Sequence, residues 1–269
     1  NADGSMNPYT LVAAKEAGVT AIYKMGGAQA VAALAYGTES LKPVHKIVGP
    51  GNIYVNLAKK LVYGQVDIDM LAGPSEILIV ADKSAKPEYV AADLLSQAEH
   101  DIMASAILLT PEKALAQEVQ KQVEIQLEKL LRQEIARQAL EQAGGIILTQ
   151  DLEEAVALAN ELAPEHLELA LEDPFRWLGK IENAGAIFLG HYSPEPLGDY
   201  YAGPNHVLPT GGTAKFYSPL NVDMYVKKTS VIAYSEIGLK AVGRDIMKLA
   251  TVEGLDAHAQ AIKVRLKEN

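Results

Sequence analysis

The sequence has 269 residues, of which 49% are hydrophobic and 22% are charged, a composition typical of a globular protein with one or two domains. The net charge of −10, without a basic stripe, argues against nucleic-acid binding. The absence of cysteine excludes disulfides, thiol nucleophiles and thiolate metal sites, so any metal ligand must be His, Asp, Glu or an amide oxygen. No apolar run approaches the roughly 20 residues of a membrane span, and no signal peptide opens the chain. We therefore expect a soluble, cytoplasmic protein with no membrane partner.

The first part of the chain alternates predicted helices and strands. Residues 8–17 predict a helix, and residues 19–25 predict a short strand. A glycine turn then opens an alanine-rich helix over residues 26–37. Residues 46–48 predict a strand, and a glycine-proline turn leads from it into an amphipathic helix over residues 53–64. This order is typical of a parallel α/β unit.

The central part of the chain continues the alternation. We expect strands at residues 76–82, 106–111, 144–150 and 182–190. Between them we expect helices at residues 86–101, 111–143 and 151–162, the last with Asp151 as its N-cap. The pattern as a whole predicts an α/β fold of parallel-sheet, Rossmann-like domains.

A long irregular region, residues 190–222, follows the last predicted strand and contains five of the 13 prolines. Long loops within compact domains are usually functional or disordered, and the Tyr, Phe and His side chains here favour function. The C-terminal tail predicts two helices, one over residues 237–253 and one after Gly254.

The segment LLSQAEHD places Gln97 and His100 three residues apart, so that both lie on one face of a helix. An imidazole and an amide oxygen in that position could share a metal ion. Alternatively, the two residues only finish a helix near its C-terminus, where a histidine is electrostatically favourable.

The segment APEHLEL places Glu165 beside His166 after a proline turn. A carboxylate and an imidazole suit proton transfer, because histidine titrates near neutral pH and a carboxylate can activate water. The alternative is an ordinary helix start with a glutamate in its first turn.

Other polar residues gather in the loop and the tail. The loop over residues 194–212 holds Glu195, Asp199 and His206 among glycines and prolines that fix an irregular backbone. In the tail, no local pattern indicates a function for Glu253 and His258, which are more typical of exposed surface residues. The glycine turns at 24–30 and 48–52 each lead from a predicted strand into a helix, whose N-terminus could bind phosphate, but neither is a G-x-G-x-x-G motif.

Seven segments in this order resemble the histidinol dehydrogenase family: GGAQAVAALAYGTES, VGPGNIYVNLAKK, DMLAGPSEILIVAD, DLLSQAEHD, APEHLEL, GDYYAGPNHVLPTGG and EGLDAHA. Together they extend over nearly the whole chain. The resemblance implies a homodimeric, zinc- and NAD-dependent enzyme. Such an enzyme oxidises L-histidinol to L-histidine through the aldehyde, with two hydride transfers to two NAD molecules.

The resemblance also implies roles for individual residues. The zinc ligands would be Gln97, His100, Asp199 and His258, the last of them completing the site of the neighbouring subunit. His166 would take the alcohol proton, and Glu165 would activate the water that hydrates the aldehyde. The expected substrate contacts are Ser75, Gln97, His100, His166, Asp199, His206, Glu253 and His258. The expected NAD contacts are Gln29 and Asn52.

Members of the family are longer, and the part absent from this sequence is N-terminal. The chain begins with Asn1, which indicates a processed N-terminus or a fragment. We therefore expect residues 1–76 to form an incomplete NAD-side domain, 77–222 an α/β domain with the metal and acid–base residues, and 223–269 a small helical tail that forms the dimer. The alternatives are a related dehydrogenase acting on another small alcohol, or an inactive zinc-binding fragment.

Overall fold

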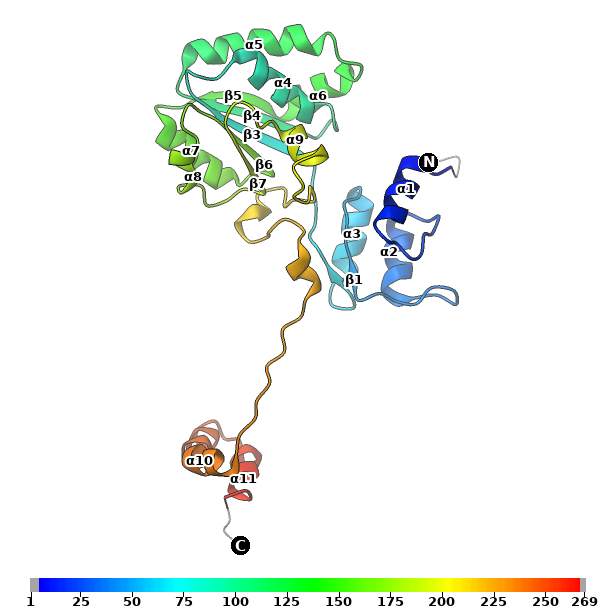
Figure 1. The fold of residues 1–269 in the computed structure, drawn as a ribbon, viewed down its shortest axis with the longest axis vertical. Helices are drawn as coiled ribbons and strands as arrows, with labels where there is room; N and C mark the ends of the chain where they lie inside the picture. Colours follow the sequence, from blue (N-terminus) through cyan, green and yellow to red (C-terminus); the bar gives the residue numbers. More distant parts are fainter. Residues whose placement is uncertain (1–4, 267–269) are drawn as a thin grey trace. The chain divides into compact units, whose positions relative to one another are not determined.

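The computed structural model describes residues 5–266 (Figure 1). Contacts within the chain divide it into two compact units, Asn1–Met224 and Tyr225–Asn269. The predicted boundaries after residues 76 and 222 stay predictions. Among the described residues, no helix is both long and apolar enough to cross a membrane.

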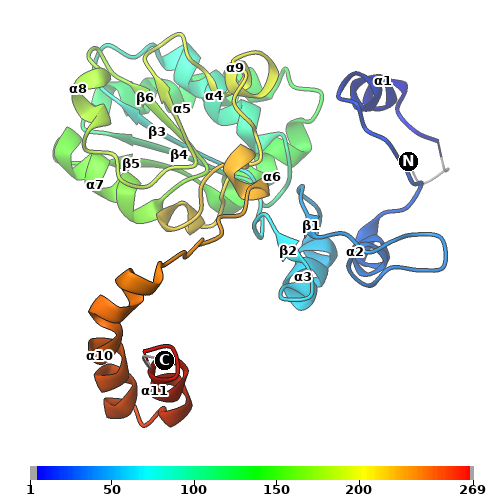
Figure 2. The ribbon, with the colours of Figure 1, turned by 60° about the horizontal axis from the view of Figure 1, so that its bottom comes forward.

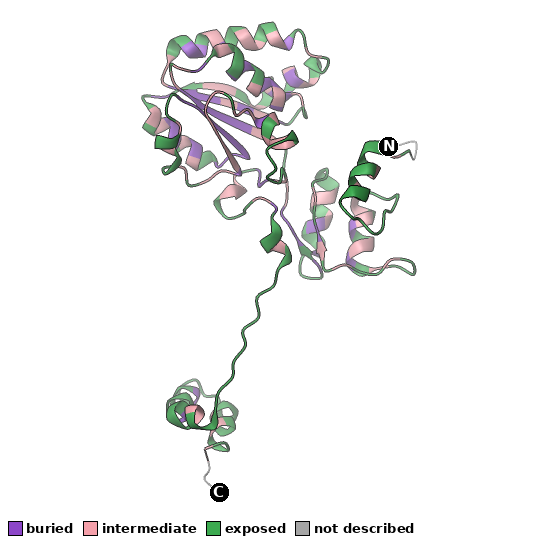
Figure 3. Ribbon diagram, in the orientation of Figure 1, coloured by how far each residue is buried: buried purple, intermediate pink, exposed green. Residues whose placement is uncertain are grey.

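The first unit is built around a parallel sheet of five strands in the order β5-β4-β3-β6-β7. The strands are β3 (Glu76–Ala81), β4 (Ser105–Thr110), β5 (Gly144–Leu148), β6 (His166–Ala170) and β7 (Ala186–Leu189). The inner strands β3, β4 and β6 are largely buried, whereas β5 and β7 at the two sides of the sheet are partly exposed (Figure 3). In the register of the two central strands, Ile77 of β3 lies opposite His166 of β6. This pairing brings the segments before β3 and β6 together, although they are about 90 residues apart in the sequence.

Helices cover both faces of this sheet (Figures 1 and 2). On one face lie α4 (Pro87–Ala98), α5 (Lys113–Leu127) and α6 (Gln133–Ala143). On the other lie α7 (Leu152–Leu162) and α8 (Phe175–Leu178). Strand β6 alternates between the two faces, because successive side chains of a strand point in opposite directions. Leu167 and Leu169 pack toward α7, which leaves His166 and Glu168 on the face of α4.

The segment before β3 holds α1 (Pro8–Glu16), α2 (Gly27–Tyr36), β1 (Lys46–Ile47), α3 (Ile53–Val62) and β2 (Asp67–Ile68). Strands β1 and β2 pair in parallel. Ile47 of β1 and Val66, the residue before β2, share a small apolar cluster with α2 and α3. Beside this cluster lies a fully buried ion pair, Lys59 with Asp69. The Lys59 ammonium also donates to the carbonyl of Gly49 at 3.0 Å, and the Asp69 carboxylate accepts the N–H of Gly49 at 2.7 Å. The ion pair therefore fixes both polar groups of Gly49, which has the positive φ of 108° that favours glycine.

The remaining elements follow the sheet. They are α9 (Glu195–Tyr200), the 3-10 turns η1 (Thr213–Lys215) and η2 (Val222–Tyr225), and the tail helices α10 (Glu236–Val252) and α11 (Asp256–Lys263). The two tail helices pack closely at Gly243, where an added Cβ would meet the Ile262 side chain of α11 at 3.2 Å.

The predicted parallel α/β class is confirmed, and so is Asp151 as the N-cap of α7, where its side chain accepts the N–H of Glu154. The strand predicted at residues 19–25 is wrong, because no strand of the described chain lies beside it to complete its hydrogen bonds. The helix predicted over residues 111–143 is two helices, α5 and α6. Strand β6 was not predicted.

Candidate active site

The candidate site lies at the end of the sheet where strands β3 and β6 begin. Helix α4 runs back from the opposite end, so its C-terminal end reaches the same place. A cavity of about 290 Å³ opens there and brings together seven of the residues predicted for the site: Ser75, Gln97, His100, Glu165, His166, Asp199 and His206. In open parallel sheets, ligands usually bind at the carboxyl ends of the strands. This site lies at their amino ends, so its side chains come in part from the loops and helices that reach this end of the sheet.

The hydrogen bond of His166 defines its protonation. Its Nδ1 lies 2.8 Å from the carbonyl oxygen of Glu76, and a carbonyl can only accept, so Nδ1 carries a hydrogen. Burial lowers the pKa of His166, so the imidazole is neutral and Nε2 keeps its lone pair. This Nε2 lies 3.8 Å from Oε1 of Glu195. His166 is therefore arranged as a base with a single available nitrogen.

Glu165 lies beside this imidazole and is itself buried. Its Oε2 accepts the N–H of Glu76 at 3.0 Å, and one carboxylate oxygen of Glu76 accepts the N–H of Glu165 at 3.3 Å. Burial is the main reason that the pKa of Glu165 rises to about 8, and the nearby carboxyl groups of Glu76, Glu195 and Asp199 raise it further. A carboxyl group with that pKa can both give and take a proton near neutral pH.

Gln97 and Asp199 supply the oxygen atoms that a metal ion would need. Gln97 is 1% exposed, and its Oε1 is a buried acceptor without a hydrogen-bond partner. Ligand atoms of His166, Glu195 and Asp199 lie within 4.8 Å of one another and could hold a cation. Since buried polar atoms are normally paired, an orphaned amide oxygen beside imidazole and carboxylate fits a divalent cation such as Zn²⁺.

Comparisons with known proteins identify the family. The family model for histidinol dehydrogenase matches residues 1–266. The chain belongs to the histidinol dehydrogenase family. It is 64% identical over 266 residues to histidinol dehydrogenase from Heliobacterium mobile and 62% identical over 261 residues to that from Carboxydothermus hydrogenoformans. A crystal structure of histidinol dehydrogenase from Elizabethkingia anophelis matches with a TM-score of 0.93 at 46% identity.

The alignments cover nearly all of this chain but only part of each relative. For the two relatives they extend over 99% and 97% of this chain, and over 62% and 61% of the relatives. For the crystal structure they extend over 97% of this chain and 60% of that chain. The resemblance to the histidinol dehydrogenase family is therefore confirmed, and the chain spans about three fifths of the length of these members.

Four of the residues expected from the family resemblance do not line this cavity. Asn52 is the N-cap of α3, and its side-chain oxygen accepts the N–H groups of Tyr54 and Val55. Gln29 is exposed in the first turn of α2. Glu253 and His258 lie in the separate C-terminal unit, where both are exposed. The roles expected for these four residues stay predictions.

Three further carboxyl groups near the site were not predicted as functional residues: Asp93, Glu76 and Glu168. Glu76 holds His166 through its carbonyl and Glu165 through its carboxylate. Glu168 lies two residues after His166 on the same face of β6. A strand assignment for HLELA would have placed Glu168 on the same face as His166, because side chains alternate along a strand.

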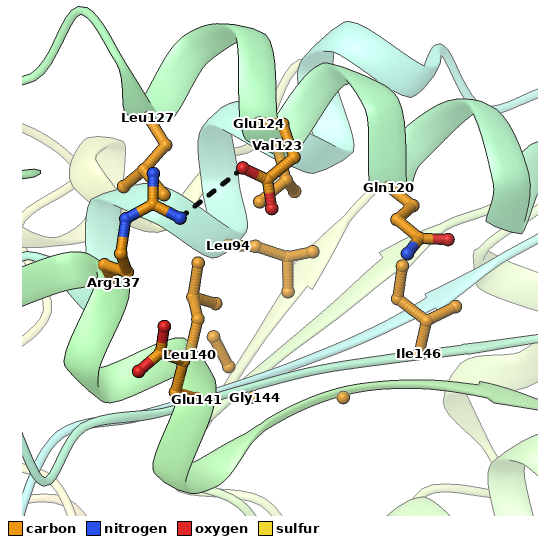
Figure 4. A pocket seen from close by; sticks show the side chains of 12 residues that line it. Leu94, Gln120, Val123, Glu124, Leu127, Arg137, Leu140, Glu141, Gly144 and Ile146 are labelled. Atoms are coloured by element: carbon orange, nitrogen blue, oxygen red, sulfur yellow. Dashed lines mark ion pairs between the residues drawn. The ribbon is translucent and has the colours of Figure 1, made fainter.

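A second cavity, of about 260 Å³, lies between α5, α6 and the sheet (Figure 4). Its floor is apolar and includes Leu94 and Ile146, and at its mouth Arg137 pairs with Glu124 at 3.6 Å. None of the residues predicted for the site lines this cavity, so it is separate from the candidate active site.

Proposed function

We propose that this chain provides the zinc site and the acid–base groups of an enzyme that oxidises L-histidinol to L-histidine through the aldehyde, with NAD as hydride acceptor. The observation that carries this proposal is the neutral, buried His166 beside Glu165 in a cavity that also holds the unpaired oxygen of Gln97. Membership of the histidinol dehydrogenase family supports the choice of substrate.

Gln97, His100 and Asp199 would hold the zinc ion together with His258 of the partner subunit. When bound, zinc supplies a positive charge that orients the substrate. Ser75 and His206, which also line the cavity, would contact histidinol. We assign Glu253 to the same task, and Gln29 and Asn52 to NAD.

His166 would act as the general base of the first oxidation. Its Nε2 would take the proton of the alcohol oxygen as the alcohol carbon loses a hydride, with its electron pair, which NAD⁺ would accept when bound. The aldehyde then forms without charge build-up on oxygen. Because Nδ1 is fixed to the carbonyl of Glu76, the ring cannot turn to present its other nitrogen.

Glu165 would act on water in the second half of the reaction. Burial raises its pKa, which makes the ionised carboxylate a stronger base than an exposed glutamate. It would take one proton from the water that adds to the aldehyde carbon, and the resulting hydrate would lose a second hydride, which a second NAD⁺ would accept. The products are the carboxylate, two NADH and protons, so that atoms and electrons balance.

The test is to purify the protein, measure its zinc by elemental analysis, and follow NADH formation from histidinol and NAD⁺. We expect the parent protein to bind zinc and His100→Ala to lose it. We expect His166→Ala to keep zinc but lose turnover.

Equal turnover of a simple diol would favour a dehydrogenase of another small alcohol. Zinc binding without NADH formation would favour an inactive zinc-binding fragment. This alternative is consistent with a chain that spans about three fifths of the length of its relatives. A working enzyme would be a cytoplasmic homodimer.

A further inference from the structure

Glu168 is a buried acidic residue of the sheet that the proposed chemistry does not use. It lies in β6 between Ile79 of β3 and Phe188 of β7, and only 5% of it is exposed. A glutamate is rarely buried this deeply unless its oxygens have partners. The partners of Glu168 come from two different helices, α4 and α9.

The first partner is the start of α9. Oε1 of Glu168 accepts the N–H of Glu195, the first residue of this helix, at 2.7 Å. The residue before the helix, Pro194, offers no side-chain cap, so Glu168 takes over that task from another element. Asp199 lies four residues after Glu195, about one helical turn further on. Fixing the start of this short helix therefore fixes the position of Asp199.

The second partner is Asp93 of α4, whose carboxyl group forms a hydrogen bond with that of Glu168. Two carboxyl groups can form such a bond only if one of them carries a proton. Burial raises the pKa of Glu168 well above its usual value and that of Asp93 to about 6, which favours retention of a shared proton. Gln97 lies four residues after Asp93, again about one helical turn away.

We propose that Glu168 is a positioning residue that ties α4 to α9 and thereby sets the distance between Gln97 and Asp199. Each partner of Glu168 precedes one of these residues by one turn, and His166 lies on the same strand two residues earlier. Glu168 does not itself line the cavity. It acts through Asp93 and Glu195. The inference rests on the proposed function in one respect, namely that Gln97 and Asp199 bind zinc.

The experiment compares Glu168→Leu with Glu168→Gln in the full chain. Leucine fills the space but leaves Glu195 N–H and Asp93 without partners. Glutamine restores both bonds, because its oxygen accepts and its amide group donates. We expect Glu168→Leu to weaken zinc binding by about tenfold or more, as for other residues that orient metal ligands, and Glu168→Gln to stay within about threefold of the parent. Zinc affinity is measured by competition with a chelating dye.

Amide hydrogen exchange of residues 195–202 in the metal-free protein provides a second measurement of whether Glu168 positions α9. We expect faster exchange in Glu168→Leu and unchanged exchange in Glu168→Gln. Leu169→Ala is the matched control, because Leu169 is equally buried on the opposite face of β6. It should lower the melting temperature without changing zinc affinity or exchange in α9. A merely structural Glu168 would behave in the same way as this control.

The two proposals fail in different ways. If the parent protein binds no zinc, the proposed function is wrong, and exchange in α9 still decides whether Glu168 positions this helix. If Glu168→Leu leaves both zinc affinity and exchange unchanged, the positioning role is wrong. Should Glu168→Leu fail to fold, Asp93→Leu tests the link through α4 alone. That variant should weaken zinc binding while leaving the bond from Glu195 to Glu168 in place, and unchanged affinity would overturn the proposal.

Discussion

Glu76 and Glu165 each accept a hydrogen bond from the backbone N–H of the other, at 3.3 Å and 3.0 Å. The second oxygen of Glu76 accepts a third bond, from the N–H of Gly211. These bonds hold two carboxyl groups side by side at the start of neighbouring strands, where burial raises the pKa of both. The reciprocal bonds thus fix a proposed catalytic group, while burial makes its ionised form unfavourable.

Glu165 should make the metal-free protein less stable at alkaline pH. Its folded-state pKa of about 8 lies above the ordinary value of 4.5, so the stability that it contributes is complete below 4.5 and is lost as the pH rises through 8. At about 1.4 kcal/mol per pH unit, Glu165 should by itself cost the parent on the order of 2–3 kcal/mol between pH 6 and pH 8. In urea unfolding, Glu165→Gln should therefore lose less stability than the parent over this pH range.

The exposed Glu182 provides the control, because Glu182→Gln should leave the pH dependence unchanged. Parallel stability profiles for the parent and Glu165→Gln would show that Glu165 does not hold its proton in the folded protein.

Gln97→Leu should change stability and zinc binding in opposite directions. In the metal-free protein the Gln97 oxygen is buried and unpaired, a situation that typically costs about 1–3 kcal/mol. Leucine of similar size removes this penalty, so the free energy of unfolding should rise by about 1 kcal/mol while zinc affinity falls. For comparison, His100→Ala at an exposed position should lose zinc with little change in metal-free stability. A less stable metal-free Gln97→Leu would mean that the oxygen has a partner after all.

The sequence predicted those parts of the fold that depend on local pattern. The apolar runs at 76–82 and 106–111 and the N-cap Asp151 mark elements that the structure contains. Residues 19–25 have an equally apolar pattern but form no strand. Strand formation depends on a hydrogen-bonding partner, which local pattern does not reveal.

The site was accessible to sequence reasoning only in part. Resemblance to a family indicated His166 and Gln97, and the structure brings both to one cavity. The roles of Glu76 and Glu168 depend on the register between strands about 90 residues apart, and no local pattern encodes that register. Glu168 was also hidden because HLELA alternates polar and apolar residues, which suggests one wet face, whereas all five residues are buried.

The buried pair of Lys59 and Asp69 should show strong coupling in a double-mutant cycle. Asp69→Leu leaves a buried ammonium without its counter-charge, and breaking such a pair costs about 3–5 kcal/mol. Lys59→Met with Asp69→Leu removes both charges and should cost less than the sum of the single changes. Urea unfolding measures all three variants. As a control, Asp67→Asn at a half-exposed ion pair should cost about 1 kcal/mol or less. Additive effects of the buried pair would contradict the coupling.

Variants of His258 in the C-terminal tail can distinguish a zinc site shared between two subunits from a zinc site within one chain. If His258 of the partner subunit completes each zinc site, then neither His258→Ala nor His100→Ala is active alone, but mixed dimers regain one intact site. In such a dimer the His258→Ala subunit keeps its own Gln97, His100 and Asp199 and receives an unaltered tail. Random mixing should restore about a quarter of the parent activity, since half of the dimers are mixed and half of their sites are intact. Subunits are exchanged in mild denaturant, and NADH formation is compared with each variant treated alone. Activity that never returns, although mass analysis detects the mixed dimer, would assign His258 to its own chain or to no zinc site at all.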